Sequence, residues 1–217
     1  GALSVVLTIG GLFMAVVALG GDSAYVRYFL SARTFEERRM VTSTWIGFLA
    51  IWGVVAAFLL VPLSPAIARL AIGVPGEGEL VAIALLLTPV RLTNLMCAQI
   101  LRNEFRAGLF TVLNVVALAL LVGCSLFAAI TLGLGVLGVL LGTLVAELLM
   151  LPIRIATARH MLGLHFSPTV LRRLLAFGVP LVPASLAYWV FTTSDRVLLS
   201  NLSSLQEVGL YSVAASL

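Results

Sequence analysis

The sequence predicts an all-α integral membrane protein, a polytopic bundle of transmembrane helices. Of its 217 residues, 61% are hydrophobic and 10% are charged. The mean hydropathy of +1.17 exceeds what a water-soluble domain could cover with polar surface. Four runs, 1–21, 40–68, 107–146 and 174–194, contain no Asp, Glu, Lys or Arg. Such runs suit helices that cross a hydrocarbon core of roughly 30 Å.

The remaining composition excludes several other classes. The net charge of +4 comes with 13 basic residues that are all arginine and are dispersed among apolar runs, which favours a membrane over a nucleic-acid partner. Cys97 and Cys124 lie in apolar segments without disulfide or zinc spacing, so we interpret both as packing thiols. The chain opens at Gly1 and stops at Leu217 inside apolar sequence, which we interpret as a fragment of a longer protein.

The first two spans are separated by a short polar stretch. The first span lies within residues 3–31, which form about 43 Å of helix at 1.5 Å per residue, longer than the core requires. The polar stretch 33–39 follows, and the second span is expected at 41–61. It ends before Pro62 and Pro65, because proline interrupts a helix and disfavours helical geometry in the preceding residue.

The third, fourth and fifth spans follow a glycine-rich loop. The third is expected at 80–101, closed by the polar turn 102–106. Residues 107–146 would form about 60 Å of continuous helix, so they are expected to fold back near Gly133 and Gly135. This places the fourth and fifth spans at 108–131 and 136–155. In the fifth, Gly138 and Gly142 form a small-xxx-small pair that would admit a neighbouring helix closely.

A basic linker precedes the last visible spans. We expect an N-terminal transmembrane lobe at 1–155, a basic, amphipathic cytoplasmic linker at 156–173, and the start of a C-terminal lobe at 174–217. Within the linker, Ser167 and Pro168 predict a helix start. The sixth span is expected at 174–199 with a kink near Pro180 and Pro183, and a seventh begins near Glu207. His160 and His165 lack Cys or carboxylate partners at metal-ligand spacing and are interpreted as linker residues.

The distribution of the arginines along the chain tests this assignment of membrane spans. Nine of them (33, 38, 39, 102, 106, 154, 159, 172 and 173) follow the first, third and fifth spans, whereas only Arg69 follows an even-numbered span. By the positive-inside rule, the odd connections are cytoplasmic. The first visible helix then runs from outside to inside, which predicts at least one further helix upstream.

A few charged residues remain within or at the edges of the spans. A charge at membrane depth costs about 2.5 to 3.5 kcal/mol on insertion scales, so such residues are usually paired or face a wet cavity. The functional candidates are therefore Asp22, Arg27, Arg91, Glu147, Asp195 and Arg196.

The sixth span carries a polar stripe. Ser185, Tyr188, Thr192 and Asp195 share one helix face, with Arg196 on its flank. The stripe could line a polar substrate path. The alternative is that Asp195 and Arg196 lie near the outer interface and extend their charged groups into water.

Arg91 lies near the middle of the third span, with Asn94 and Arg102 on nearly the same face. It could bind an anionic group such as a phosphate, because the guanidinium donors match phosphate oxygens. The alternative is a structural ion pair with Glu147 or Asp22. For Glu147 itself, near the cytoplasmic end of its span, the sequence favours a pair with a loop arginine.

Asp22 and Arg27 lie five residues apart, about 140° around a helix, so partners on other helices are expected. If the first span is confined to residues 1–20, both are interfacial.

The sequence shows no nucleophile-base arrangement and no phosphate-cradling glycine loop, so we expect no enzyme, no cofactor and no metal site. A transporter, flippase, channel or scaffold remains.

Five stretches carry a resemblance to a known family. The sequences at 177–186, 193–196 and 207–212 resemble the F-G-x-P-x-x-P, S-D-R and E-x-G-x-Y-S segments of Wzx-type polysaccharide (O-antigen) flippases. Residues 21–29 are similar to the G-x-x-x-A-x-x-R-F/Y stretch of that family, and 33–39 resemble its cytoplasmic loop. These flippases belong to the multidrug/oligosaccharidyl-lipid/polysaccharide exporter superfamily.

The resemblance implies a two-lobed fold of 12 to 14 helices, of which this chain carries the second to the seventh. It implies a multi-pass protein of the bacterial cytoplasmic (inner) membrane, with lipid-linked oligosaccharide, the bilayer, and polysaccharide polymerase and glycosyltransferases as partners. The lobes would rock between inward-open and outward-open states. They would move an undecaprenyl-pyrophosphate-linked oligosaccharide from the cytoplasmic to the outer leaflet, for surface polysaccharide biosynthesis.

Arg27, Asp195 and Arg196 match motif positions of this family. The resemblance implies that Arg27 is a cavity cation for pyrophosphate or sugar and that Asp195 is a polar cavity residue or coupling-ion site held by Arg196. From the residues alone, we add Arg91 and Tyr188 as substrate-binding candidates and Asp22 as a second coupling-ion candidate.

Two alternatives stay open. A cation-coupled multidrug antiporter of the same superfamily would favour an acidic or apolar cavity, whereas interior arginines and acids balance here three to three. A nontransporting membrane scaffold for polysaccharide assembly would need none of the interior charges.

Overall fold

The computed structural model describes residues 2–71, 78–163, 165–187 and 190, and this part of the chain is a helical bundle without strands. Five helices are long and apolar enough to cross a membrane, or six if the bent pair formed by α1 and α2 is one span. The predicted polytopic helical fold is confirmed. The helices in chain order are α1 (Ala2–Val17), α2 (Gly21–Ser31), α3 (Phe35–Leu60), η1 (Val61–Leu63), α4 (Ser64–Ala71), α5 (Gly78–Asn103), α6 (Ala107–Leu126), η2 (Phe127–Thr131), α7 (Gly135–Ala158), α8 (Pro168–Gly178) and η3 (Val179–Leu181).

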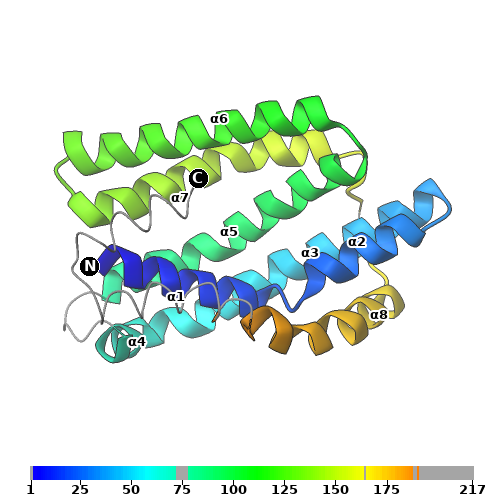
Figure 1. The fold of residues 1–217 in the computed structure, drawn as a ribbon, viewed down its shortest axis with the longest axis horizontal. Coiled ribbons are helices and arrows are strands. Elements are labelled where there is room, and N and C mark those ends of the chain that lie inside the picture. The colour runs from blue at the N-terminus through cyan, green and yellow to red at the C-terminus, as the bar shows by residue number, and fades with distance from the viewer. Residues whose placement is uncertain (1, 72–77, 164, 188–189, 191–217) are drawn as a thin grey trace.

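The spans alternate in direction, and the arginine-rich connections gather at one end of the bundle. Figure 1 shows the α2–α3, α5–α6 and α7–α8 connections on the right, with the η2–α7 turn at the opposite end. This is the arrangement that the positive-inside rule predicts for a threaded membrane protein.

The first span differs from the prediction. Instead of one helix within 3–31, the chain forms α1 and α2, bent by 42°. Leu19 and Gly20 have φ angles of 51° and 63°, and a right-handed helix cannot continue through left-handed residues. The break lies against the end of α8, where a Cβ on Gly20 would be 2.3 Å from the Gly178 carbonyl oxygen. This close approach explains why a glycine occupies the break.

α3 begins earlier than predicted. The Thr34 hydroxyl accepts a hydrogen bond from the Glu37 backbone N–H, and the Glu37 carboxylate accepts one from the Thr34 N–H. This capping box starts the helix at Phe35, so most of the polar stretch 33–39 is its first turn rather than a loop. The helix ends at Leu60, before Pro62, as predicted.

α6 and α7 form a tightly packed hairpin. Gly133 and Gly135 adopt φ angles of 67° and 52°, which confirms the predicted turn. A Cβ on Gly142 would lie 2.5 Å from the Cys124 carbonyl oxygen, and Gly138 is equally close to the backbone of Ala128. The small-xxx-small pair therefore packs against α6 and η2, which confirms the predicted close approach of a neighbouring helix.

α8 begins inside the segment predicted as linker. The Ser167 hydroxyl accepts a hydrogen bond from the Val170 N–H and Pro168 occupies the first turn, as predicted. The apolar helical segment spans Pro168–Ala187, so it starts six residues before the expected 174. The helix tightens into the 3-10 turn η3 at the position where a kink was predicted.

The core of the described residues lies in three clusters, of which two are large and the third is a small one between α5, α6 and α7. Tyr25, Trp45 and Leu174 belong to one, which joins α2, α3, α5 and α8, while Val6 and Leu140 belong to another, around α1, α5 and α7. α5 is the central helix, because 56% of its apolar window is buried against 17% for the span that includes α6. The outer face of α6 is apolar and exposed, as expected for a surface in contact with lipid.

Candidate functional site

Polar side chains from three helices meet inside the bundle. We call this group the interior polar cluster. Its members are Arg91 and Asn94 on α5, Asn114 on α6, and Glu147 and Arg154 on α7. Polar groups at membrane depth are costly unless they satisfy one another, so such a cluster is a candidate functional site.

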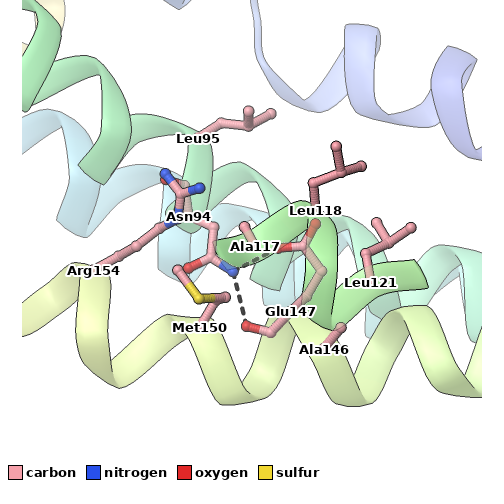
Figure 2. A pocket seen from close by; sticks show the side chains of 9 residues that line it. All are labelled: Asn94, Leu95, Ala117, Leu118, Leu121, Ala146, Glu147, Met150 and Arg154. Carbon is pink, nitrogen blue, oxygen red and sulfur yellow. Dashed lines mark hydrogen bonds between the residues drawn. The ribbon is translucent and has the colours of Figure 1, made fainter. Parts of the chain in front are cut away.

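Glu147 and Asn94 form the centre of the cluster (Figure 2). The Asn94 amide Nδ2 donates to the Glu147 carboxylate at 2.6 Å and to the Glu147 carbonyl oxygen at 2.8 Å. The Arg91 Nε lies 3.8 Å from Oε1 of the same carboxylate. Of the two alternatives for Arg91, an ion pair with Glu147 is therefore present. The predicted pair of Glu147 with a loop arginine is wrong, because Glu147 faces the middle of α5.

Arg154 is a site residue that the sequence analysis missed. The positive-inside count places it with the arginines of the connection after the fifth span, but α7 continues to Ala158 and buries Arg154 to 6% exposure. Its Nη2 donates to the Asn114 Oδ1 at 2.9 Å, and its Nη1 donates to the Asn94 carbonyl at 3.4 Å. Glu147 and Arg154 lie seven residues apart and so share a helix face. That spacing was the available signal.

The cluster carries more positive than negative charge. Arg91 and Arg154 contribute two guanidinium groups, whereas Glu147 contributes one carboxylate. Both hydrogen-bond partners of Arg154 are neutral oxygens. A pocket of about 190 Å³ lies beside Asn94, Glu147 and Arg154, walled mainly by apolar side chains of α6 and α7. The arrangement can hold water or a small anionic group next to Arg154.

Arg27 lies apart from this cluster, on α2. Its guanidinium carbon is 4.4 Å from the centre of the Phe177 ring on α8, and Tyr28 packs edge-on against the same ring. Its contact on another helix is thus aromatic rather than acidic. Asp22 is exposed, and within the described ranges no cation lies within ion-pair distance of it. The structure does not join Asp22 or Arg27 to Arg91, because the cluster is built from α5, α6 and α7.

Much of the predicted polar stripe on the sixth span lies outside the described residues. This applies to Tyr188, Thr192, Asp195 and Arg196, and also to the predicted seventh span near Glu207. Ser185 is described, and its hydroxyl donates to the Leu181 carbonyl at 3.1 Å.

The segment between α7 and α8 is held by polar side chains of α3. The Ser43 hydroxyl donates to the Met161 carbonyl at 3.1 Å and accepts from the Gly163 N–H at 2.8 Å. His160 lacks a nearby carboxylate in sequence, but folding brings the Glu104 carboxylate to 2.7 Å from its Nε2. Among the described residues, no three His, Cys, Asp or Glu side chains come together as a metal site.

Comparisons with known proteins bear on the whole chain. Residues 1–217 match the model of a family described as polysaccharide biosynthesis protein. None of the curated proteins matches the chain. One similar solved structure is the inward-facing conformation of a multidrug resistance MATE family transporter of the MOP superfamily, with 22% identity and a TM-score of 0.64. The match covers 87% of this chain and 46% of that one, so the chain spans about half of the transporter and shares its fold.

Proposed function

This chain belongs to the polysaccharide biosynthesis protein family, and from that premise we propose that it forms part of a membrane flippase for a lipid-linked oligosaccharide. The cargo is an undecaprenyl-pyrophosphate-linked oligosaccharide, moved from the cytoplasmic to the outer leaflet for surface polysaccharide biosynthesis. The observation that carries the proposal is the family match over the whole chain. The transporter fold of the structural neighbour supports it.

The charges inside the bundle suit an anionic cargo. In the interior polar cluster, the guanidinium groups of Arg91 and Arg154 outnumber the one carboxylate, that of Glu147. A guanidinium group offers a fork of donors that matches the oxygens of a diphosphate. A cavity that selects cationic drugs would need the opposite balance.

We assign the residues to roles on this basis. Arg27 contacts the pyrophosphate or the sugar, and Arg91 anchors a phosphate. Tyr188, Asp195 and Arg196 complete the substrate path on the sixth span. Asp22 and Asp195 are the candidates for a coupling ion. The lobes are residues 1–155 and 174–217, joined by the segment 156–173, so the contact of Arg27 with Phe177 lies between them.

The proposed setting is the cytoplasmic membrane of a bacterium. The helices that could cross a bilayer support a multi-pass membrane protein. Polysaccharide polymerase and glycosyltransferases are the proposed partners, because they would consume and supply the cargo.

The proposal is tested in the host of the full-length protein. Deleting the gene is expected to cause lipid-linked oligosaccharide to accumulate, with unchanged drug tolerance. Wild type and Arg27→Lys restore export, whereas Arg27→Ala does not. Arg69→Ala is the matched control, because Arg69 is an exposed arginine on α4, at the other end of the bundle.

Other results would point to other functions. Unchanged lipid intermediates with lost drug tolerance would identify a cation-coupled antiporter instead. Normal export by both Arg27→Ala and Asp195→Ala in a strain that needs the protein would identify a nontransporting scaffold.

A further inference from the structure

A second, larger cleft opens between α1 and the helices α5, α6 and α7. We call it the α1 cleft. Its volume is about 580 Å³, within the range of roughly 300 to 1,000 Å³ that is typical of small-molecule sites. Residues from all four helices line it, and most of them are apolar. On α1 they include Leu7, Gly10 and Met14, and on α6 they include Val122.

The hydroxyl groups in the α1 cleft are already satisfied by the protein. Thr88 donates to the Ala84 carbonyl at 3.1 Å, and Thr143 donates to the Val139 carbonyl at 2.8 Å. Ser125 donates to the same Val139 carbonyl at 3.3 Å. The two threonine bonds run to the preceding turn of their own helices, and the serine bond crosses from α6 to α7. All three use up the hydroxyl hydrogens. The walls therefore offer an apolar surface, and a polar occupant would lose its hydration without compensation.

Arg91 is the charged residue among those that line the α1 cleft. Its side chain is 45% exposed, and its Nε stands 3.8 Å from the Glu147 carboxylate, beyond hydrogen-bond distance. The described part of the chain gives Arg91 no hydrogen bond. Its guanidinium donors are consequently available to phosphate oxygens. The cleft thus combines an apolar channel with one cation on its lining.

We infer that the α1 cleft binds the isoprenoid chain of a polyprenyl diphosphate, with Arg91 holding the phosphate next to that chain. This inference rests on the proposed function and names the part of the cargo that the first lobe recognises. Charge complementarity selects this occupant. The apolar chain matches the apolar walls of the cleft, and the phosphate at its end matches the guanidinium group of Arg91. The interior polar cluster, reached through Arg91, borders the phosphate end.

Glycine keeps the cleft open. A Cβ added to Gly10 would stand 3.7 Å from the Ala84 Cβ, an ordinary contact distance, so a Cβ at this position does not force the backbone to move. A tryptophan at Gly10 would fill the cleft. The matched control is Gly123→Trp on α6, where an added Cβ meets no atom within 4 Å.

The test uses the full-length protein in liposomes with a polyprenyl diphosphate that carries a photoreactive group on its isoprenoid chain. We expect photo-adducts on Leu7, Met14 or Val122, competed by unlabelled undecaprenyl diphosphate. Gly10→Trp lowers labelling at the remaining cleft residues by roughly tenfold, whereas Gly123→Trp labels as wild type does. Arg91→Gln lowers labelling by roughly tenfold, as expected for the loss of charge-assisted hydrogen bonds, and Arg91→Lys restores part of it.

Three results would overturn the inference. The photo-adducts on the wild-type protein could form mainly outside the α1 cleft, or Gly10→Trp could be labelled as strongly as wild type. A dialkyl glycerophosphate could also compete for labelling as well as undecaprenyl diphosphate does. Flipping of the lipid-linked oligosaccharide is measured in the same liposomes. Normal flipping by both wild type and Gly10→Trp would rule out the α1 cleft as a binding site and would still support the proposed flippase function. If the wild-type protein is labelled in the cleft but flips no oligosaccharide, the proposed flippase function would be ruled out instead.

Discussion

The interior polar cluster and the contact between α2 and α8 hold their helices together in opposite ways. In the cluster, hydrogen bonds of Asn94 and Arg154 join α5 to α7 and α7 to α6. Between α2 and α8, aromatic and cation–π contacts on Phe177 lie beside backbones that touch at Gly20 and Gly178. Buried hydrogen bonds are costly to break, whereas aromatic contacts can slide. The comparison sets a hydrogen-bonded unit of α5, α6 and α7 against an apolar seam between α2 and α8, and we propose that the seam is the part that separates.

Removing Arg154 is the strongest test of the hydrogen-bonded unit. Arg154→Leu leaves the Asn114 amide oxygen without this donor, and an unsatisfied buried group costs about 1–3 kcal/mol. We expect the largest fall in thermal melting temperature of the full-length protein in detergent. Arg159→Leu, an exposed arginine on the same helix end, is the control. Equal melting of the two variants would contradict a cluster held by hydrogen bonds.

Glu147→Gln removes the negative charge of the interior polar cluster and keeps the shape of the side chain. Arg91 and Arg154 then lack their counter-charge, and the loss of a charged hydrogen-bond acceptor costs about 1.5–3 kcal/mol. Adding Arg91→Gln should recover part of this stability in a double-mutant cycle. Simple additivity of the two changes would show that the ion pair contributes nothing.

Gly178→Ala tests whether the seam separates. Its Cβ would lie 2.6 Å from the Leu19 carbonyl oxygen, so α8 must move away from the break between α1 and α2. We expect a stability loss of only about 1 kcal/mol, with a clear loss of oligosaccharide export. Gly108→Ala, at a position open to solvent or lipid, should leave both unchanged. Normal export by Gly178→Ala would argue that the contact is passive packing.

Phe177→Leu should have the smallest effect on stability. It removes the ring beneath Arg27, and an exposed cation–π contact is worth about 0.5–1 kcal/mol. The check is the melting temperature beside that of Phe105→Leu, which alters a ring exposed to 87%. A destabilisation as large as that of Arg154→Leu would show that the seam is no weaker than the cluster.

The sequence predicted the spans well because charged residues are excluded from lipid-facing helices. The turn at Gly133 and Gly135 and the end of α3 before Pro62 followed from the same local chemistry. The break at Leu19 and Gly20 did not, because its left-handed geometry accompanies a tertiary contact with Gly178, far along the chain. Local signals do not carry such contacts.

The site was predicted only in part. Arg91 and Glu147 were recognised as interior charges and do form a pair. Arg154 was missed because counting arginines by connection assigns any arginine near a helix end to the loop. Arg154 shares a helix face with Glu147, and Asn114 is a polar residue in an otherwise apolar span. These two features were the signals that could have placed Arg154 in the site. The roles of Tyr188, Asp195 and Arg196 stay predictions, since these residues lie outside the described part.

We propose that the fold of this chain serves to move a lipid-linked oligosaccharide between leaflets. The most direct measurement reconstitutes the full-length protein in liposomes with a fluorescent undecaprenyl-pyrophosphate-linked oligosaccharide and follows its exposure to an external glycan-cleaving enzyme. We expect protein-dependent exposure of the inner-leaflet pool that is lost in Arg27→Ala and retained in Arg69→Ala. Exposure at the rate of empty liposomes, from a correctly folded protein, would contradict it.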